Sequence, residues 1–189
     1  MVKWPITKDM ENKNENIEVG PAVPGDEAGI AAVYKDTWLA TYPNAAAGIT
    51  KNDVLSMAKN FDSVESLKNW KEKISGSRSK QNYVCVAKVS GRIVAFCCGK
   101  KFEEYNQLSA IYIAPGYQRQ GIGRQLIADV FEWLGKNKKI IVAPVAYNLP
   151  AIGFYKRIGF AVVEGKSSSR QLPSGKIMPL IEMEINFNN

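Results

Sequence analysis

The sequence predicts an α+β or α/β fold with a mixed sheet, and three observations support this class. Three strand-like runs follow one another in the middle of the chain, over 83–89, 92–100 and about 105–113. Helix-like stretches with an apolar stripe lie before and after these runs. No repeat or linker divides the 189 residues, a length that fits one domain. We therefore expect one domain over 17–189, preceded by a loose polar arm over 1–16.

The first half is expected to open with a strand and to continue with helices. Residues 17–23 form a short strand ended by Pro-Gly, and a helix follows over about 25–41. Residues 50–53 resemble a capping box for a short helix. Asp62 is a candidate cap for a further helix, which reaches residue 74, and 75–81 is a loop.

In the second half, each turn signal separates two regular elements. Ser90-Gly91 is a two-residue hairpin signal between the first two strands of the middle region. The later elements, in order, are a helix over 121–136 closed by Gly135, a strand over 139–147, a helix over 148–158, and two strands over 160–165 and 176–187 around a Ser-rich loop.

The first helix carries an aromatic stripe. Tyr34, Trp38 and Tyr42 are spaced four apart and so share one side of a helix. Such a stripe indicates core packing more often than a substrate site. We interpret it as core, with a substrate site as the alternative.

Residue types exclude several chemistries. The chain contains no histidine, which excludes Ser-His-Asp and Cys-His triads and histidine-based zinc sites, and no metal site is expected. Cys85, Cys97 and Cys98 lie in strand-like runs, and we interpret them as buried free thiols. Chemistry must therefore use carboxylates, tyrosines, backbone amides or water.

The net charge of +7 suits an anionic partner, either nucleic acid or a phosphate-rich cofactor. The Lys and Arg residues are scattered and no nucleic-acid-reading motif accompanies them, so we interpret them as a solvated surface and expect no nucleic acid. No apolar run approaches the roughly 18–20 residues that span a bilayer, so no membrane is expected. The amino-terminal residues lack a signal peptide's apolar stretch, and the sequence predicts a cytoplasmic protein.

Two glycines stand where the helix over 121–136 begins. The first amides of a helix have no internal partner and bind phosphate readily if no side chain blocks the approach. Gly121 and Gly123 remove two Cβ atoms at this point, and Arg119 and Arg124 add positive charge. The arrangement suits a diphosphate, although the glycines could instead serve only a tight turn.

Two familiar phosphate loops are excluded by spacing. A Walker A loop starting at Gly116 would need Lys-Ser/Thr where Ile122-Gly123 stands. A dinucleotide fingerprint would need a third glycine at position 126, which is Leu126. ATP and NAD are therefore not expected here.

The same residues resemble the acetyl-CoA loop of the GNAT superfamily of N-acetyltransferases, Q/R-x-x-G-x-G/A. The match is Gln118-Arg119-Gln120-Gly121-Ile122-Gly123, and the preceding Ile111-Tyr112-Ile113-Ala114-Pro115 resembles the strand end before that loop. The family's second motif is matched by Asn148, by Tyr155 seven residues later, and by the pair Gly159-Phe160.

The resemblance implies a GNAT fold, a mostly antiparallel sheet that is splayed at the cofactor site and flanked by helices. It also implies direct transfer of an acetyl group from acetyl-CoA to a primary amine of a small molecule, polyamine or protein. Tyr155 would be the catalytic residue. The cofactor-binding residues implied are Ile111, Tyr112, Ile113, Gln118, Arg119, Gln120, Gly121, Ile122, Gly123, Arg124 and Asn148.

A tyrosine suits the proton transfer that this reaction needs. A hydroxyl with a pKa of about 10 can protonate a departing thiolate without being ionised at neutral pH. Packing alone is the alternative for Tyr155, and capping of a helix is the alternative for Asn148.

The strand over 139–147 contains Pro144, although it is otherwise typical of a central strand. A proline removes a ladder donor, so the ladder is expected to be broken there.

The base that takes the amine proton is unassigned. Many relatives carry Glu at the position of Gln107, which cannot act as a base. Glu103 and Glu104 are nearby but are expected to be exposed hairpin carboxylates, and a water chain is the alternative. The missing Glu keeps a non-catalytic acyl-CoA-binding domain as an alternative function. A longer acyl-CoA and a monomer or homodimer are also open.

Overall fold

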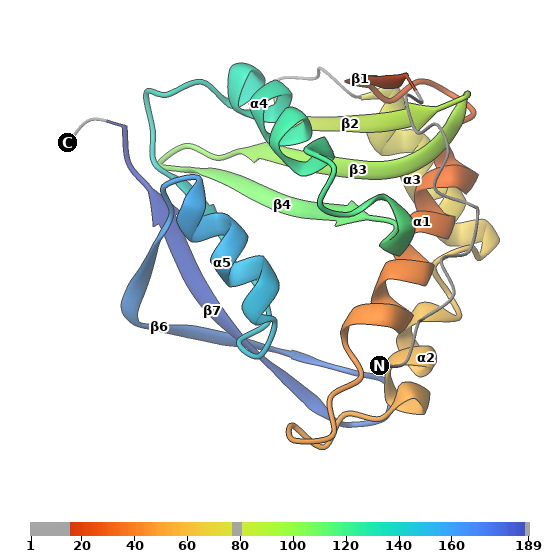
Figure 1. Ribbon diagram of the computed structural model, residues 1–189, viewed down its shortest axis with the longest axis vertical. Coiled ribbons are helices and arrows are strands. Elements are labelled where there is room, and N and C mark those ends of the chain that lie inside the picture. The colour runs from red at the N-terminus through yellow and green to blue at the C-terminus, as the bar shows by residue number, and fades with distance from the viewer. Residues whose placement is uncertain (1–15, 77–80, 188–189) are drawn as a thin grey trace, which may run out of the picture.

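Seven strands form one sheet in the order β1-β2-β3-β4-β5-β7-β6 in the computed structural model, which describes residues 16–76 and 81–187 (Figure 1). The strands are β1 (Ile17–Pro21), β2 (Asn82–Val89), β3 (Arg92–Lys101), β4 (Asn106–Ile113), β5 (Ile140–Val142), β6 (Ala161–Gln171) and β7 (Ile177–Ile185). The helices are α1 (Glu27–Thr41), α2 (Lys51–Ala58), α3 (Val64–Ser75), α4 (Ile122–Leu134) and α5 (Leu149–Arg157), with a 3₁₀ turn η1 (Pro115–Tyr117).

Neighbouring strands are antiparallel except for β4 and β5, which are parallel. The prediction of a mixed, mostly antiparallel sheet flanked by helices is thereby confirmed. The predicted order of elements is also confirmed.

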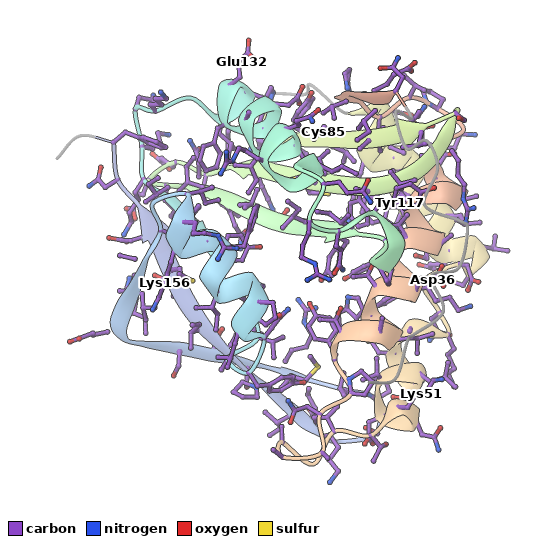
Figure 2. All side chains as sticks on the ribbon, in the orientation of Figure 1. Asp36, Lys51, Cys85, Tyr117, Glu132 and Lys156 are labelled. Carbon is purple, nitrogen blue, oxygen red and sulfur yellow. The ribbon has the colours of Figure 1, made fainter. Side chains whose placement is uncertain are left out.

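Helices cover both faces of the strands β1 to β4. On one face α4 packs with its apolar stripe inward, and Leu126, Val130 and Leu134 are buried against β2 and β3. Burying one such side chain contributes about 1.5–3 kcal/mol. Glu132 points outward from α4, while Cys85 lies in the sheet beneath it (Figure 2). On the other face α1 packs against β3 and β4, and α3 packs against β2.

The sheet is splayed between its fourth and fifth strands. β4 pairs with β5 only at Asn106 with Ile140 and at Gln107 with Ile141. Beyond these two pairs β4 has no β5 partner, and Figure 1 shows β4 and β7 running apart with α5 beside β7. The splay expected from the family resemblance is confirmed, and it exposes one edge of β4 within the sheet.

The predicted strand over 139–147 is much shorter in the structure, because Pro144 interrupts its pairing. β5 ends at Val142, which confirms the break expected at the proline. The Pro144 carbonyl still accepts a hydrogen bond from the Ile181 amide at 3.0 Å. Since the N–H and C=O of one strand residue point to the same side, the missing donor of Pro144 faces β7.

A β-bulge changes the facing of β4 halfway along its length. Cys98 pairs with Ala110, but the next residue, Gly99, pairs with Leu108, so Ser109 is an extra residue. As a result Leu108 packs on the α4 side of the sheet, whereas Ala110 and Tyr112 pack on the α1 side. No sequence signal indicated this bulge.

Local signals predicted several element ends correctly. Thr50 and Asp53 form the reciprocal capping box, with the Asp53 amide 3.1 Å from Thr50 Oγ1. Ser90 and Gly91 have φ of 49° and 77°, as a two-residue hairpin turn requires. The cap predicted at Asp62 is wrong, since Ser63 caps α3 instead.

The last hairpin differs from its prediction. β6 extends to Gln171, through a segment that the sequence suggested was a Ser-rich loop. Its residues 161–171 are almost all exposed because β6 is the edge of the sheet. A strand with no buried side lacks the alternation that predicts strands.

Cys85, Cys97 and Cys98 are buried free thiols, as predicted. Burial raises the pKa of Cys98 to about 12. The polar arm predicted over 1–16 lies, except for residue 16, outside the described residues. None of the helices in the described part of the chain is long and apolar enough to cross a bilayer.

Candidate active site

The loop that leads from β4 into α4, residues 116–123, is called the phosphate loop below. It begins within η1, ends in the first turn of α4, and contains two residues with positive φ, Arg119 at 61° and Gly121 at 84°. A left-handed conformation costs an L-residue such as Arg119 roughly 1–2 kcal/mol. The loop therefore holds a conformation that its surroundings must stabilise.

Two glutamine side chains supply that stabilisation by binding backbone oxygens. Gln118 Nε2 donates to the Ile113 carbonyl at 3.1 Å, and Gln120 Nε2 donates to the Gly116 carbonyl at 3.1 Å. Sequence reasoning placed both residues at the cofactor, but the structure gives their side chains a role in shaping the loop.

The amides of the phosphate loop take no part in these contacts. Within the described residues, the amides of 118–123 donate no hydrogen bond, and the first bonded amides are those of Arg124 and Gln125, which donate to the Gly121 carbonyl at 3.0 and 3.2 Å. The positive end of the α4 dipole lies at the same place. A group of free donors at a helix start is a site for an anion.

Two arginine side chains belong to the same stretch of chain as these amides. Arg119 and Arg124 are exposed, and neither belongs to an ion pair with a described residue. Their positions fit the predicted role of adding positive charge for a diphosphate.

The two glycines of the loop serve different purposes. A Cβ added to Gly121 would meet nothing within 4 Å, so Gly121 provides its φ of 84° and an open approach to the amides. A Cβ added to Gly123 would lie 3.1 Å from Ile113 Cδ1 and 3.2 Å from Phe154 Cζ. Gly123 therefore permits close packing of α4 against β4 and α5, a contact that spacing alone did not indicate.

Three residues at the end of β4 were predicted to bind the cofactor, and their side chains lie on different faces of the sheet. Ile111 and Ile113 pack with the core on the α4 side, whereas Tyr112 packs on the α1 side. Their backbone lies along the strand edge that β5 leaves unpaired. The structure therefore offers the backbone of residues 111–113, rather than the Tyr112 ring, to a ligand in the splay.

Tyr155 lies on α5 and is 6% exposed. Its ring packs near Phe154 and Phe160, with centroids 5.6 and 5.7 Å away. Burial raises the pKa of its hydroxyl, and Cys97 and Tyr112 raise it further. Tyr155 therefore keeps its proton at neutral pH, and its hydroxyl makes no hydrogen bond to any described residue.

Asn148 caps α5, which was the alternative to cofactor binding for this residue in the sequence analysis. Its Oδ1 accepts a hydrogen bond from the Ala151 amide at 3.2 Å. Its Nδ2 has no partner among the described residues, so capping leaves the donor half of this amide available to a ligand.

A group of aromatic residues lies on the α1 side of the splay. This aromatic cluster is Tyr34, Trp38, Tyr42 and Tyr112. Trp38 Nε1 donates to Tyr112 Oη at 3.1 Å, and the hydroxyls of Tyr42 and Tyr112 are 3.4 Å apart. Trp38 is fully buried and Tyr42 is 8% exposed, so the stripe predicted as core is core.

Two hydroxyls of the aromatic cluster, those of Tyr42 and Tyr112, are within electrostatic reach of Tyr155. Burial is the main cause that raises the pKa of Tyr42 to about 12, and the Tyr155 hydroxyl is near enough to raise it further. Tyr112 in turn raises the pKa of Tyr155. The sequence could not indicate this meeting, because Tyr112 lies 70 and 74 residues from its two hydrogen-bond partners.

The two carboxylates considered as the base lie away from Tyr155 and the phosphate loop. Glu103 and Glu104 are exposed, as predicted, in the turn between β3 and β4. That turn lies at the end of β4 where Asn106 and Gln107 pair with β5, which is the closed end of the splay. Within the described residues, no group of three or more Cys, Asp or Glu side chains could hold a metal ion.

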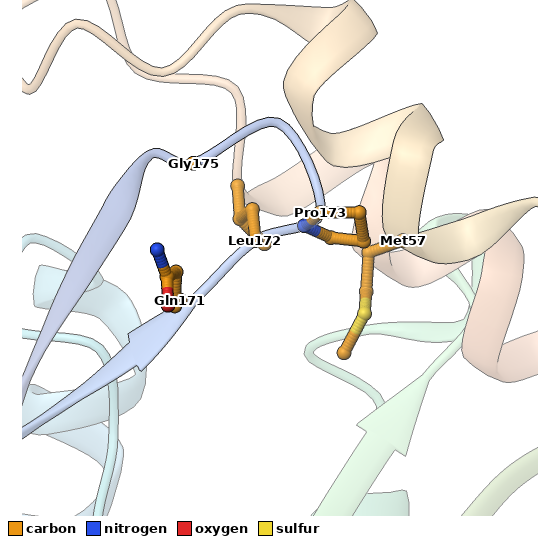
Figure 3. Close-up of a pocket in the computed structure, with 5 residues that line it drawn as sticks. All are labelled: Met57, Gln171, Leu172, Pro173 and Gly175. Carbon is orange, nitrogen blue, oxygen red and sulfur yellow. The ribbon is translucent and has the colours of Figure 1, made fainter.

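A shallow cavity of about 410 Å³ lies at the tip of the β6–β7 hairpin, where it meets α2 (Figure 3). Its lining is Met57, Gln171, Leu172, Pro173 and Gly175. None of these residues belongs to the phosphate loop, the β4 edge or α5. The cavity is therefore separate from the predicted cofactor site.

Solved structures with a similar fold include three named acetyltransferases. The PaiA N-acetyltransferase of Thermoplasma acidophilum, in complex with coenzyme A, has a TM-score of 0.73 at 19% identity, with 91% of this chain and 99% of that chain covered. The ribosomal-protein-alanine N-acetyltransferase of Brucella melitensis gives 0.65 at 19%, covering 90% and 99%. The ribosomal-protein-S18-alanine N-acetyltransferase of Escherichia coli gives 0.60 at 18%, covering 90% and 93%.

At these identities the structures show a shared fold. No curated protein matches the chain in sequence. The model of the acetyltransferase (GNAT) family matches residues 50–160, which is more than half of the chain and includes β2 to β5, the phosphate loop and Tyr155. The protein is therefore an acyltransferase that belongs to the GNAT family of acetyltransferases.

Proposed function

We propose that this protein transfers the acetyl group of acetyl-CoA to a primary amine of a small molecule or a protein. The observation that carries the proposal is the set of unbonded amides over residues 118–123, placed at the start of α4 and beside the splay. A ligand in which a long arm separates a diphosphate from a thioester fits such an arrangement.

The fit is specific to the parts of the ligand. The diphosphate would accept hydrogen bonds from the amides of the phosphate loop, with Arg119 and Arg124 beside it. The amide-bearing pantetheine arm would lie along the unpaired edge of residues 111–113, near Asn148 Nδ2. Acetyl-CoA supplies an activated acetyl group when bound.

In the transfer, the amine nitrogen forms a bond to the acetyl carbon, the carbon–sulfur bond breaks, and one proton leaves the nitrogen while one reaches the sulfur. Tyr155 is suited to give the second proton, because burial of the residue keeps its hydroxyl protonated and the hydroxyl has no hydrogen bond to a described residue. An amide of the β4 edge would stabilise the carbonyl oxygen.

Gln107 cannot receive the first proton, and Glu103 and Glu104 lie at the closed end of the splay. We propose that water carries this proton away. The lack of a glutamate at position 107 is also the reason for considering a non-catalytic acyl-CoA-binding domain as the alternative function. Membership of an acetyltransferase family supports the enzyme over that alternative.

Calorimetric titration with acetyl-CoA, with CoA and ATP as controls, tests the cofactor, and thiol release from an amine panel then tests transfer. Micromolar binding of acetyl-CoA and CoA but not of ATP, with thiol release on one class of amine, supports the proposal. Binding without release supports the non-catalytic alternative. No binding would mean that the phosphate loop is only a turn.

A further inference from the structure

Arg170, near the end of β6, lies over the aromatic cluster. Its guanidinium carbon is 5.4 Å from the centroid of the Trp38 ring, although the two residues belong to a carboxy-terminal edge strand and to the first helix. Stacking on an indole orients the planar guanidinium. Arg170 is therefore a cation held at a defined place on an otherwise uncharged cluster.

The guanidinium of Arg170 has no carboxylate partner among the described residues. The ion pairs found within the described residues use other cations, and Lys166 on the same strand pairs with Glu182 Oε1 at 3.3 Å. A guanidinium presents five N–H donors in a plane that matches carboxylate or phosphate oxygens. In Arg170 these donors are available to a ligand.

The positive charge of Arg170 affects the pKa of three tyrosines, and one of these tyrosines in turn affects the pKa of Tyr155, the proposed proton donor. Its electrostatic effect lowers the pKa of Tyr34, Tyr42 and Tyr112, each of which burial raises more strongly. Tyr112 in turn acts on Tyr155. Arg170 and Tyr155 therefore both lie within electrostatic reach of this group of hydroxyls.

Within the described residues, no carboxylate lies among this group of hydroxyls. No carboxylate is among the causes that shift the pKa of Tyr34, Tyr42, Tyr112 or Tyr155. Among the acidic residues of α1 and α2, Asp53 is held by Thr50, and Asp36 is exposed on α1 (Figure 2). A polycationic acceptor would meet a guanidinium here without a compensating carboxylate.

We propose that Arg170 binds an anionic group, a carboxylate or a phosphate, on the acceptor. The acceptor class is then a primary amine that carries a negative charge. This inference rests on the proposed acetyl transfer and names its substrate class. Arg170 sets specificity, and the chemical step does not use it.

Matched amines test the inference. Thiol release from acetyl-CoA is measured with ω-amino acids of two to six carbons, with their carboxamides, and with O-phosphoethanolamine against ethanolamine. The members of each ω-amino acid pair differ in the anionic group and much less in the amine. For the best chain length, kcat/KM is expected to be at least ~10-fold higher for the acid, as a charged hydrogen bond would give. The phosphate pair distinguishes phosphate from carboxylate as the preferred anion.

Three variants test whether Arg170 is responsible for the preference for acids over amides. Arg170→Gln is expected to bring the acid-to-amide ratio to within about twofold of one, whereas Arg170→Lys keeps part of it because the charge remains. Lys166→Gln is the matched control, since it removes one positive charge from the same strand away from the cluster, and it should leave the ratio unchanged. Unchanged calorimetric affinity for acetyl-CoA in Arg170→Gln shows that the variant is folded.

The outcomes separate the two proposals. Release with the amides that equals or exceeds release with the acids, or a ratio unchanged in Arg170→Gln, overturns the anionic acceptor and leaves acetyl transfer standing. Absence of acetyl-CoA binding and of thiol release with every amine overturns the transfer itself, and the specificity with it.

Discussion

The phosphate loop and the aromatic cluster are built in opposite ways. The phosphate loop is continuous: eight residues hold the free amides, the two residues with positive φ and the glutamines that brace them. The aromatic cluster is assembled from α1 and β4, and Arg170 of β6 covers it. A site made within one stretch is encoded by local pattern, whereas a site made from distant elements depends on the fold.

The largest effect is expected at Tyr155, the proposed proton donor. Tyr155→Phe should lower kcat by about 100-fold, because general acid catalysis contributes roughly that factor, while the Kd of acetyl-CoA stays nearly unchanged. Steady-state kinetics and calorimetry measure the two quantities. Tyr105→Phe, which removes a hydroxyl from the β3–β4 hairpin, is the control. Turnover equal to wild type in Tyr155→Phe would remove Tyr155 as proton donor.

The next effect tests the phosphate loop alone. Gly121→Leu should weaken acetyl-CoA binding by about 10-fold or more, because it strains a φ of +84° and covers the amides. Gly175→Leu is a matched control, with the same φ of +84° and no atom within 4 Å of the new Cβ. Equal affinities in the two variants would show that strain rather than phosphate access explains any loss.

The aromatic cluster has its own signature in alkaline solution. Folding holds the pKa of Tyr42 at about 12, while an unfolded tyrosine ionises near pH ~10. A raised pKa contributes stability below the unfolded value that is lost as pH rises through the folded one. We expect the melting temperature to fall between pH 10 and about 12, with a contribution of about 2 kcal/mol from Tyr42.

Thermal unfolding followed at pH 9 to about 12, for wild type and Tyr42→Phe, measures this contribution. The variant should lose less stability than wild type over the alkaline range. Identical slopes for the two proteins would mean that Tyr42 ionises as easily when folded as when unfolded.

The smallest effect sharpens the distinction between the two glycines. Gly123→Ala should lower the free energy of unfolding by about 1–2 kcal/mol, because its Cβ would crowd Ile113 and Phe154. Adding Phe154→Leu should recover part of that loss. A stable Gly123→Ala with weakened cofactor binding would instead return Gly123 to the role that spacing suggested.

Prediction from sequence succeeded where the cause was local. The capping box at Thr50, the turn at Ser90 and Gly91, and the helix start at Gly121 all depend on residues within one or two turns of chain. The mostly antiparallel sheet followed from the order of such elements together with the family resemblance.

What sequence reasoning missed depends on contacts between distant segments. The extra residue at Ser109 exists only in the pairing of β3 with β4. The close approach of Phe154 to Gly123 exists only in the packing of α5 on α4. Arg170 stood in a segment expected to be a loop, and its contact with Trp38 spans most of the chain.

The composition of β6 has a consequence for solubility. An open sheet edge of eleven residues is a template on which another unfolded or partly folded chain could add a strand. In β6 that edge carries Lys166, three serines from Ser167 to Ser169, and Arg170. Charge and small polar groups along an edge disfavour aggregation. The polarity that made this strand resemble a loop in the sequence thus also protects the protein from edge-to-edge association.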